Sequence, residues 1–142
     1  MRELAILVPG LVLGIYTMLF FFYMGMNRRG AVASGQIAIK YYRTYDQGQE
    51  PERLRVLTRH SANLLETPTL FYAGLLFAHA SGAVSPFFLI AAWLYVAARF
   101  AHSFVHLGSN NVLHRFFAFA TSLVILLIFW IGVLVHTVGA LA

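Results

Sequence analysis

The chain has 142 residues, of which 60% are hydrophobic and 11% are charged, with a net charge of +5 and a mean hydropathy of +0.74. A soluble domain carries about 25% charged residues, so this composition excludes an ordinary soluble domain and indicates an integral membrane protein. The absence of cysteine excludes disulfides, thiolate metal sites and a thiol nucleophile supplied by the protein. The positive charge comes from a few clustered arginines, which suits membrane topology or an anionic ligand better than nucleic acid. Membrane lipid is therefore an expected partner, and nucleic acid is not.

Apolar runs of bilayer length define the predicted architecture, because about 20 apolar residues cross the hydrocarbon core. They predict a single all-α domain over residues 1–142, a four-transmembrane-helix bundle with a long polar loop over residues 27–50. The spans are expected at about residues 4–26, 59–81, 86–107 and 114–140.

The second helix is expected to begin outside the membrane. Pro51 suits the first helical position, and Glu52 beside it complements the positive end of the helix dipole. The helix should continue to about Ser81, with a kink near Pro68 because proline removes one backbone hydrogen bond.

The lysines and arginines predict the orientation. Most of them lie in the loop between the first two spans or around the turn between the last two, which places both connections on the cytoplasmic side. Both termini should then face the other side, where the charged residues are Arg2 and Glu3. The compact loops favour a bacterial inner membrane, and the endoplasmic reticulum is the alternative.

Two of the expected spans carry a polar face. The residues are spaced i, i+4 and i+7 in the second span and i, i+3 and i+7 in the third, so each set lies along one side of its helix. Unpaired ionisable groups inside a membrane are costly, which makes such residues candidates for a functional site. The two faces consist of Arg59, Asn63 and Glu66, and of Arg99, His102 and His106.

These two faces are expected to meet in a cationic funnel that opens to the cytoplasm. Counted inward from the cytoplasmic ends of their helices, Glu66 and Arg99 lie at matching depth, so an ion pair between them is predicted. Arg59 and Arg115 should rim the opening. A structural role for the Glu66–Arg99 pair is the alternative reading.

The remaining histidines suggest no site of their own. His60 and His114 are expected to face solvent or headgroups, and His79 and His136 should lie near the opposite membrane face. A metal site made by Glu66 and the two third-span histidines is a further alternative, but the surrounding arginines would repel a cation, so no metal is expected.

The motifs resemble those of the MAPEG family, the membrane-associated proteins in eicosanoid and glutathione metabolism. Arg59-x-x-x-Asn63-x-x-Glu66 resembles the family's second-helix signature. Arg99-Phe-Ala-His102, followed by His106-Leu-Gly, resembles its third-helix signature, closest to the branch that contains microsomal prostaglandin E synthase and bacterial members. Arg115 falls where that branch has its catalytic arginine.

This resemblance implies a homotrimer that binds glutathione, as a co-substrate, between adjacent subunits near the cytoplasmic face. The residues implied to hold the tripeptide are Arg59, Asn63, Glu66, Arg99, His102 and His106. Arg115 is implied to be catalytic and to face the sulfur, and either Arg28 or Arg29 corresponds to a further family arginine.

Three positions depart from the family pattern. His106 and Phe119 stand where tyrosine is expected, and Phe116 stands where the prostaglandin branch has serine. These replacements leave fewer hydroxyl donors for the thiol, which disfavours prostaglandin isomerisation and affects glutathione binding less.

The predicted function is therefore a membrane-bound glutathione-dependent transferase or peroxidase of lipid metabolism or detoxification. It would activate the glutathione thiol for attack on a lipophilic small-molecule electrophile or hydroperoxide. The alternatives are a protein that binds glutathione or lipid without catalysis, a structural trimer, and a small transporter. A transporter is disfavoured because the ionisable residues, apart from His79, stop halfway across the membrane.

Overall fold

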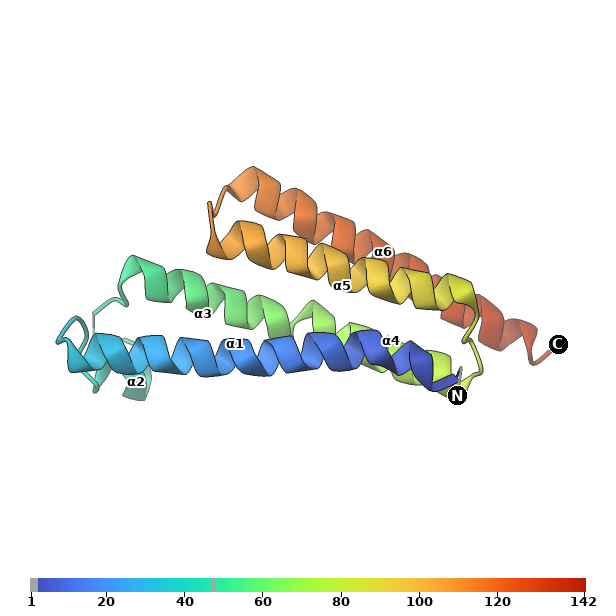
Figure 1. The fold of residues 1–142 in the computed structure, drawn as a ribbon, viewed down its shortest axis with the longest axis horizontal. Coiled ribbons are helices and arrows are strands. Elements are labelled where there is room, and N and C mark those ends of the chain that lie inside the picture. The colour runs from blue at the N-terminus through green and yellow to red at the C-terminus, as the bar shows by residue number, and fades with distance from the viewer. Residues whose placement is uncertain (1–2, 47) are drawn as a thin grey trace.

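A computed structural model describes residues 3–46 and 48–142, so Arg2 lies outside the described part of the chain. The regular elements within these ranges are all helices (Figure 1). A short 3-10 helix, η1 (Glu3–Leu7), leads into α1 (Val8–Ala33), and the small helix α2 (Tyr41–Thr44) lies in the following loop. The chain continues through α3 (Glu52–Leu65), α4 (Thr67–Ala80), α5 (Pro86–Leu107) and α6 (Val112–Gly139).

The first helix continues beyond the end expected for the first span. Residues 27–50 were expected to form a loop, but α1 includes the first part of this run and ends at Ala33. Polar identity alone does not end a helix, and arginine is a good helix former. The helix stops where Gly35 adopts a φ of +72°, a conformation that glycine reaches without steric cost.

The second predicted helix is two helices. The backbone breaks at Glu66, which has φ −76° and ψ −88°, two residues before the expected kink at Pro68. Pro68 cannot donate to the carbonyl of Leu64, and its ring crowds that carbonyl, so the helical hydrogen bonds are interrupted before the proline is reached. Pro68 itself lies in the first turn of α4, where a missing donor costs little.

The long helices run roughly side by side along the long axis of the molecule (Figure 1). α3 and α4 follow one another along α1, and α5 and α6 form an antiparallel pair beside them (Figure 1). α5 contacts η1, α1, α3 and α6. Its bounds coincide with those expected for the third span, and α6 begins two residues before the expected fourth span.

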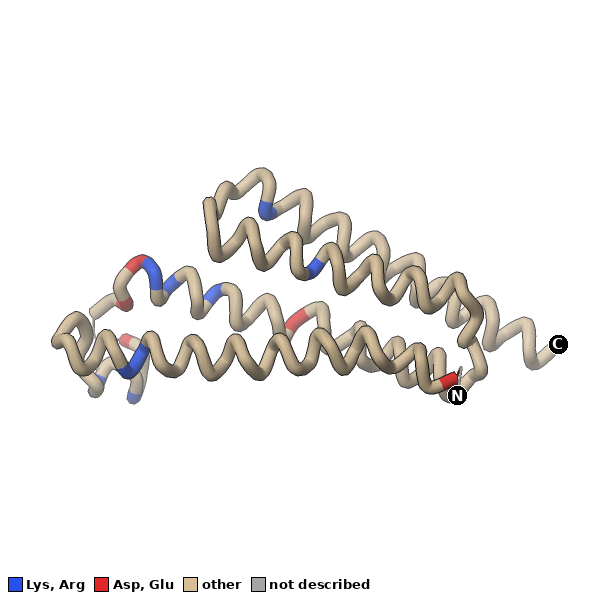
Figure 2. Tube along the Cα trace, in the orientation of Figure 1, with Lys and Arg blue, Asp and Glu red and all other residues tan. Residues whose placement is uncertain are grey.

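Three helical stretches are long and apolar enough to cross a membrane. They are Glu3–Ala33, Pro86–Leu107 and Val112–Gly139. α3 and α4 have 14 residues each, so neither crosses a bilayer alone. Most Lys and Arg residues lie toward the end that carries the α1–α3 connection and the α5–α6 turn (Figure 2). The protein is thus an all-helical integral membrane protein with its basic residues gathered toward one end.

Candidate functional site

An open cavity of about 420 Å³ is lined by residues of α3, α5 and α6 and by Glu66. Six of the seven residues predicted for the site contribute to its wall. The lining residues are Arg59, Ala62, Asn63, Glu66, His102, His106, Val112, Arg115, Phe116 and Phe119.

The α3 wall carries the polar face expected from the sequence. Arg59 and Glu66 are exposed and Asn63 is half-buried, so all three have side chains available to a ligand. The Asn63 amide nitrogen donates to the carbonyl of Arg59 at 2.9 Å, which leaves its amide oxygen free to accept from a ligand. This wall offers one cation, one anion and one amide within two turns of helix.

Arg99 lies behind the cavity and is fully buried. Its Nη2 donates to the backbone carbonyl of Asn63 at 2.7 Å, and its guanidinium lies 5.7 Å from the centre of the Phe119 ring. Nε and Nη1 have no hydrogen-bond partner among the described residues. Arg99 therefore connects α5 to the end of α3.

The predicted ion pair between Glu66 and Arg99 does not form. The ion pair found within 4.0 Å among the described residues is Arg28–Glu50 instead. The helix break explains the difference, because Glu66 lies at the end of α3 with an exposed side chain while Arg99 bonds to a backbone carbonyl that the break leaves available.

The α6 wall combines an arginine with aromatic rings. Asn111 caps α6 by accepting from the backbone N–H groups of Leu113 and His114. The preceding residue, Asn110, has a φ of +49°, and its Oδ1 accepts from Arg115 Nη1 at 2.8 Å. The turn thus positions the Arg115 guanidinium at the cavity.

A second cavity of about 340 Å³ shares Arg59, His106 and Arg115 with the first. It extends the site toward the start of α3. Its other lining residues are Gln49, Glu52, Arg55, Val56 and Asn110. The combined space is rich in arginine, with Arg59 and Arg115 common to both parts.

The two arginines considered at the end of α1 do not line either cavity. Arg28 Nε lies 3.2 Å from Glu50 Oε1, and its Nη2 donates to Thr58 Oγ1 at 2.8 Å. Arg29 is exposed. Arg28 joins α1 to the start of α3 and so supports the wall indirectly.

His60 is fully buried, and the expectation that it faces solvent is wrong. Its ring lies 5.1 Å from that of His106 and 6.1 Å from that of His102, measured between ring centres. The sequence did contain a signal for this, because Leu57, His60 and Leu64 are spaced i, i+3 and i+7 on the buried side of α3. His114, by contrast, is exposed as expected.

A protein-family model matches the chain, and neither curated proteins nor solved structures match it. The matching family model is described as the MAPEG family and covers residues 6–135. A match over nearly the whole chain, together with apolar helices of bilayer length, shows that this protein is an integral membrane protein that belongs to the MAPEG family.

Proposed function

We propose that the protein is a glutathione-dependent transferase or peroxidase that acts on lipophilic substrates. The observation that carries this proposal is the shared cavity of Arg59, Asn63, Glu66, His102, His106 and Arg115. MAPEG membership is consistent with this activity.

The charges of the cavity complement those of glutathione. The tripeptide has two carboxylates and one ammonium group, and the cavity offers Arg59 for a carboxylate and Glu66 for the ammonium, which leaves Arg115 to face the sulfur. Arginine binds carboxylates through paired, charge-assisted hydrogen bonds. In this proposal Glu66 receives the ammonium group, and the second cavity provides room for one end of the peptide.

The reactive step requires the thiolate. A thiol with a pKa of about 8.5 is only about 3% ionised at neutral pH, and lowering the pKa by about two units would raise that fraction to roughly three quarters. The positive charge of the Arg115 guanidinium would stabilise the thiolate and so lower the pKa of the thiol. The thiolate sulfur then bonds to an electrophilic carbon as the leaving group departs with the electron pair of its bond. With a hydroperoxide, the sulfur attacks the distal oxygen and releases an alcohol, and a second glutathione converts the sulfenic acid to glutathione disulfide and water.

The proposed assembly is a homotrimer in which each chain crosses the membrane four times, with α3 and α4 together forming the second crossing. Glutathione would lie between subunits near the cytoplasmic face. The end-to-end arrangement of α3 and α4 along α1 supports the fourth crossing (Figure 1). In this arrangement a lipophilic substrate would enter the cavity laterally from the bilayer.

Glutathione titration of the detergent-purified protein by calorimetry tests the proposal, paired with a conjugation assay using a generic aromatic electrophile. Binding and conjugation are both expected. Arg59→Ala should weaken binding about tenfold, because it removes a charge-assisted hydrogen bond worth about 1.5 kcal/mol. Arg43→Ala is the matched control, since it removes the same charge from an exposed position on α2, away from the cavity. No binding at millimolar glutathione would refute the proposal.

A second candidate is a glutathione-binding protein without catalysis. None of the ten residues that line the main cavity carries a hydroxyl group, so Phe116 and Phe119 leave the thiol with no such donor there. Glutathione binding without conjugation or peroxidase activity would favour this candidate.

A further inference from the structure

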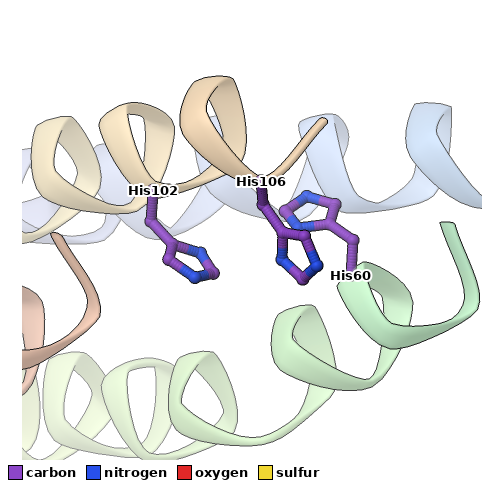
Figure 3. Close-up of side chains that lie close together, drawn as sticks. All are labelled: His60, His102 and His106. Carbon is purple, nitrogen blue, oxygen red and sulfur yellow. The ribbon is translucent and has the colours of Figure 1, made fainter. Parts of the chain in front are cut away.

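Three buried histidines from two helices converge (Figure 3), and His102 and His106 among them line the main cavity. His102 and His106 are one helical turn apart on α5, and His60 reaches them from α3. Their exposed fractions are 2%, 2% and 0%. One ring nitrogen from each lies within 4.8 Å of the other two.

The ring nitrogens of this cluster lack partners within the described chain. Nδ1 of His60, Nδ1 of His102 and both ring nitrogens of His106 are buried without a hydrogen bond. Buried polar atoms in proteins are nearly always satisfied, and leaving one unpaired costs about 1–3 kcal/mol. Several such nitrogens in one place indicate a missing partner shared by the three rings.

The outer contact of His60 fits the role of a metal ligand. Its Nε2 lies 3.4 Å from the Tyr16 hydroxyl, while its Nδ1 has no partner. Histidine ligands typically use one ring nitrogen for the metal and donate the other N–H to a nearby oxygen, which fixes the orientation of the ring. Tyr16, on α1, is in position to provide that oxygen.

We propose that His60, His102 and His106 bind one divalent transition-metal ion, with Zn²⁺ the best match. Three neutral imidazoles with an open fourth position are a zinc ligand set, and two histidines at i and i+4 on one helix face often form half of such a site. Tetrahedral bonds of about 2.05 Å place ligand nitrogens about 3.3 Å apart. Small side-chain rotations would therefore bring the three nitrogens into coordination distance.

The arginines around the site determine what completes the coordination. Arg99, Arg59 and Arg115 carry positive charge near the cluster, so the metal would be most stable with an anion as its fourth ligand. His102 and His106 also line the main cavity, which places the open position toward that space. Hydroxide or a carboxylate from the cavity has the required charge. His102 and His106 belong to both proposals, and metal binding measured without glutathione lets either proposal fail separately.

Metal titration of the full chain tests the site. The protein is purified in detergent through a tag free of histidine, stripped with chelator and titrated without glutathione, since glutathione itself binds zinc. We expect one Zn²⁺ per chain by elemental mass spectrometry, and an intense visible absorption with Co²⁺ that is typical of four-coordinate cobalt. The melting temperature should rise with metal, because ligands that bind only the folded state stabilise it.

Single substitutions assign the ligands. His60→Gln, His102→Gln and His106→Gln should each weaken metal binding at least tenfold and remove the cobalt absorption. His114→Gln is the control, because that exposed histidine at the start of α6 should leave both unchanged. X-ray absorption of the wild-type complex should count three imidazole ligands, a readout that does not depend on variant folding. Substoichiometric metal, or binding that the three substitutions do not affect, would overturn the proposal.

Discussion

In the proposed reaction, Arg115 is the residue that links glutathione binding to chemistry. Arg115 lines both cavities. Its Nη1 donates to Asn110 Oδ1 at 2.8 Å, and this hydrogen bond restricts where the guanidinium can lie. Asn110 adopts a positive φ of 49°, a conformation that asparagine tolerates better than most residues. The turn before α6 therefore controls where this positive charge lies.

Replacing Arg115 with alanine should reduce turnover about a hundredfold or more, because one preorganised electrostatic donor contributes about 10²–10³ to the rate. Glutathione affinity should fall only slightly, since Arg59, Asn63 and Glu66 remain. Steady-state conjugation measures the turnover, and calorimetric glutathione titration measures the affinity. His114→Ala, one residue away and exposed, is the control. Unchanged turnover in Arg115→Ala would rule out its catalytic role.

At the scale of elements, the α3–α4 break has a direct consequence for the site. The last carbonyls of a helix lack intrahelical donors, and the carbonyl of Asn63 in the last turn of α3 accepts from Arg99. In a continuous helix, that carbonyl would accept from the N–H of Thr67. The interruption associated with Pro68 therefore gives a buried guanidinium its hydrogen-bond partner.

Pro68→Ala should destabilise the protein by about 1–3 kcal/mol, because a straightened helix would use the Asn63 carbonyl and leave Arg99 without a bond. Thermal unfolding in detergent, followed by circular dichroism, measures the change. Pro86→Ala is the matched control, since Pro86 begins α5 and no intrahelical bond is missing there. An unchanged or raised melting temperature for Pro68→Ala would contradict this account of the break.

At the scale of the whole molecule, the number of membrane crossings determines which connections lie on the same side of the membrane. The α1–α3 connection and the α5–α6 turn lie toward one end of the molecule, and the α4–α5 turn lies toward the other (Figure 1). Basic residues are concentrated toward the first of these ends (Figure 2). Four crossings would place that end, with the candidate site, on the cytoplasmic side.

Because the chain has no cysteine, single cysteines can report this topology directly. Ser34, Ser85 and Ser109 are exposed in the three connections, so Ser→Cys at each should be tolerated. With four crossings, a membrane-impermeant maleimide added to intact cells should label the Ser85 variant and spare the other two. Three crossings would instead put Ser34 and Ser85 on one side and Ser109 on the other. Labelling after permeabilisation is the control for reactivity.

The sequence by itself determined the membrane class, the bounds of α5 and nearly those of α6, and the shared face of Arg59, Asn63 and Glu66. These features depend on local hydropathy, helix-ending residues and helical periodicity, all of which are present in a short window of residues. The family motifs likewise required no contacts between helices.

Only the tertiary structure decided the partner of Arg99 and the contact of His60 with the two α5 histidines. Each depends on which helices pack together: Arg99 reaches a carbonyl on α3, and His60 meets two rings on α5. Charge and spacing suggested a pair between Glu66 and Arg99, but they do not specify the backbone path that turns Glu66 to the surface. The histidine cluster arises because residues distant in sequence share a buried contact, which no local pattern records.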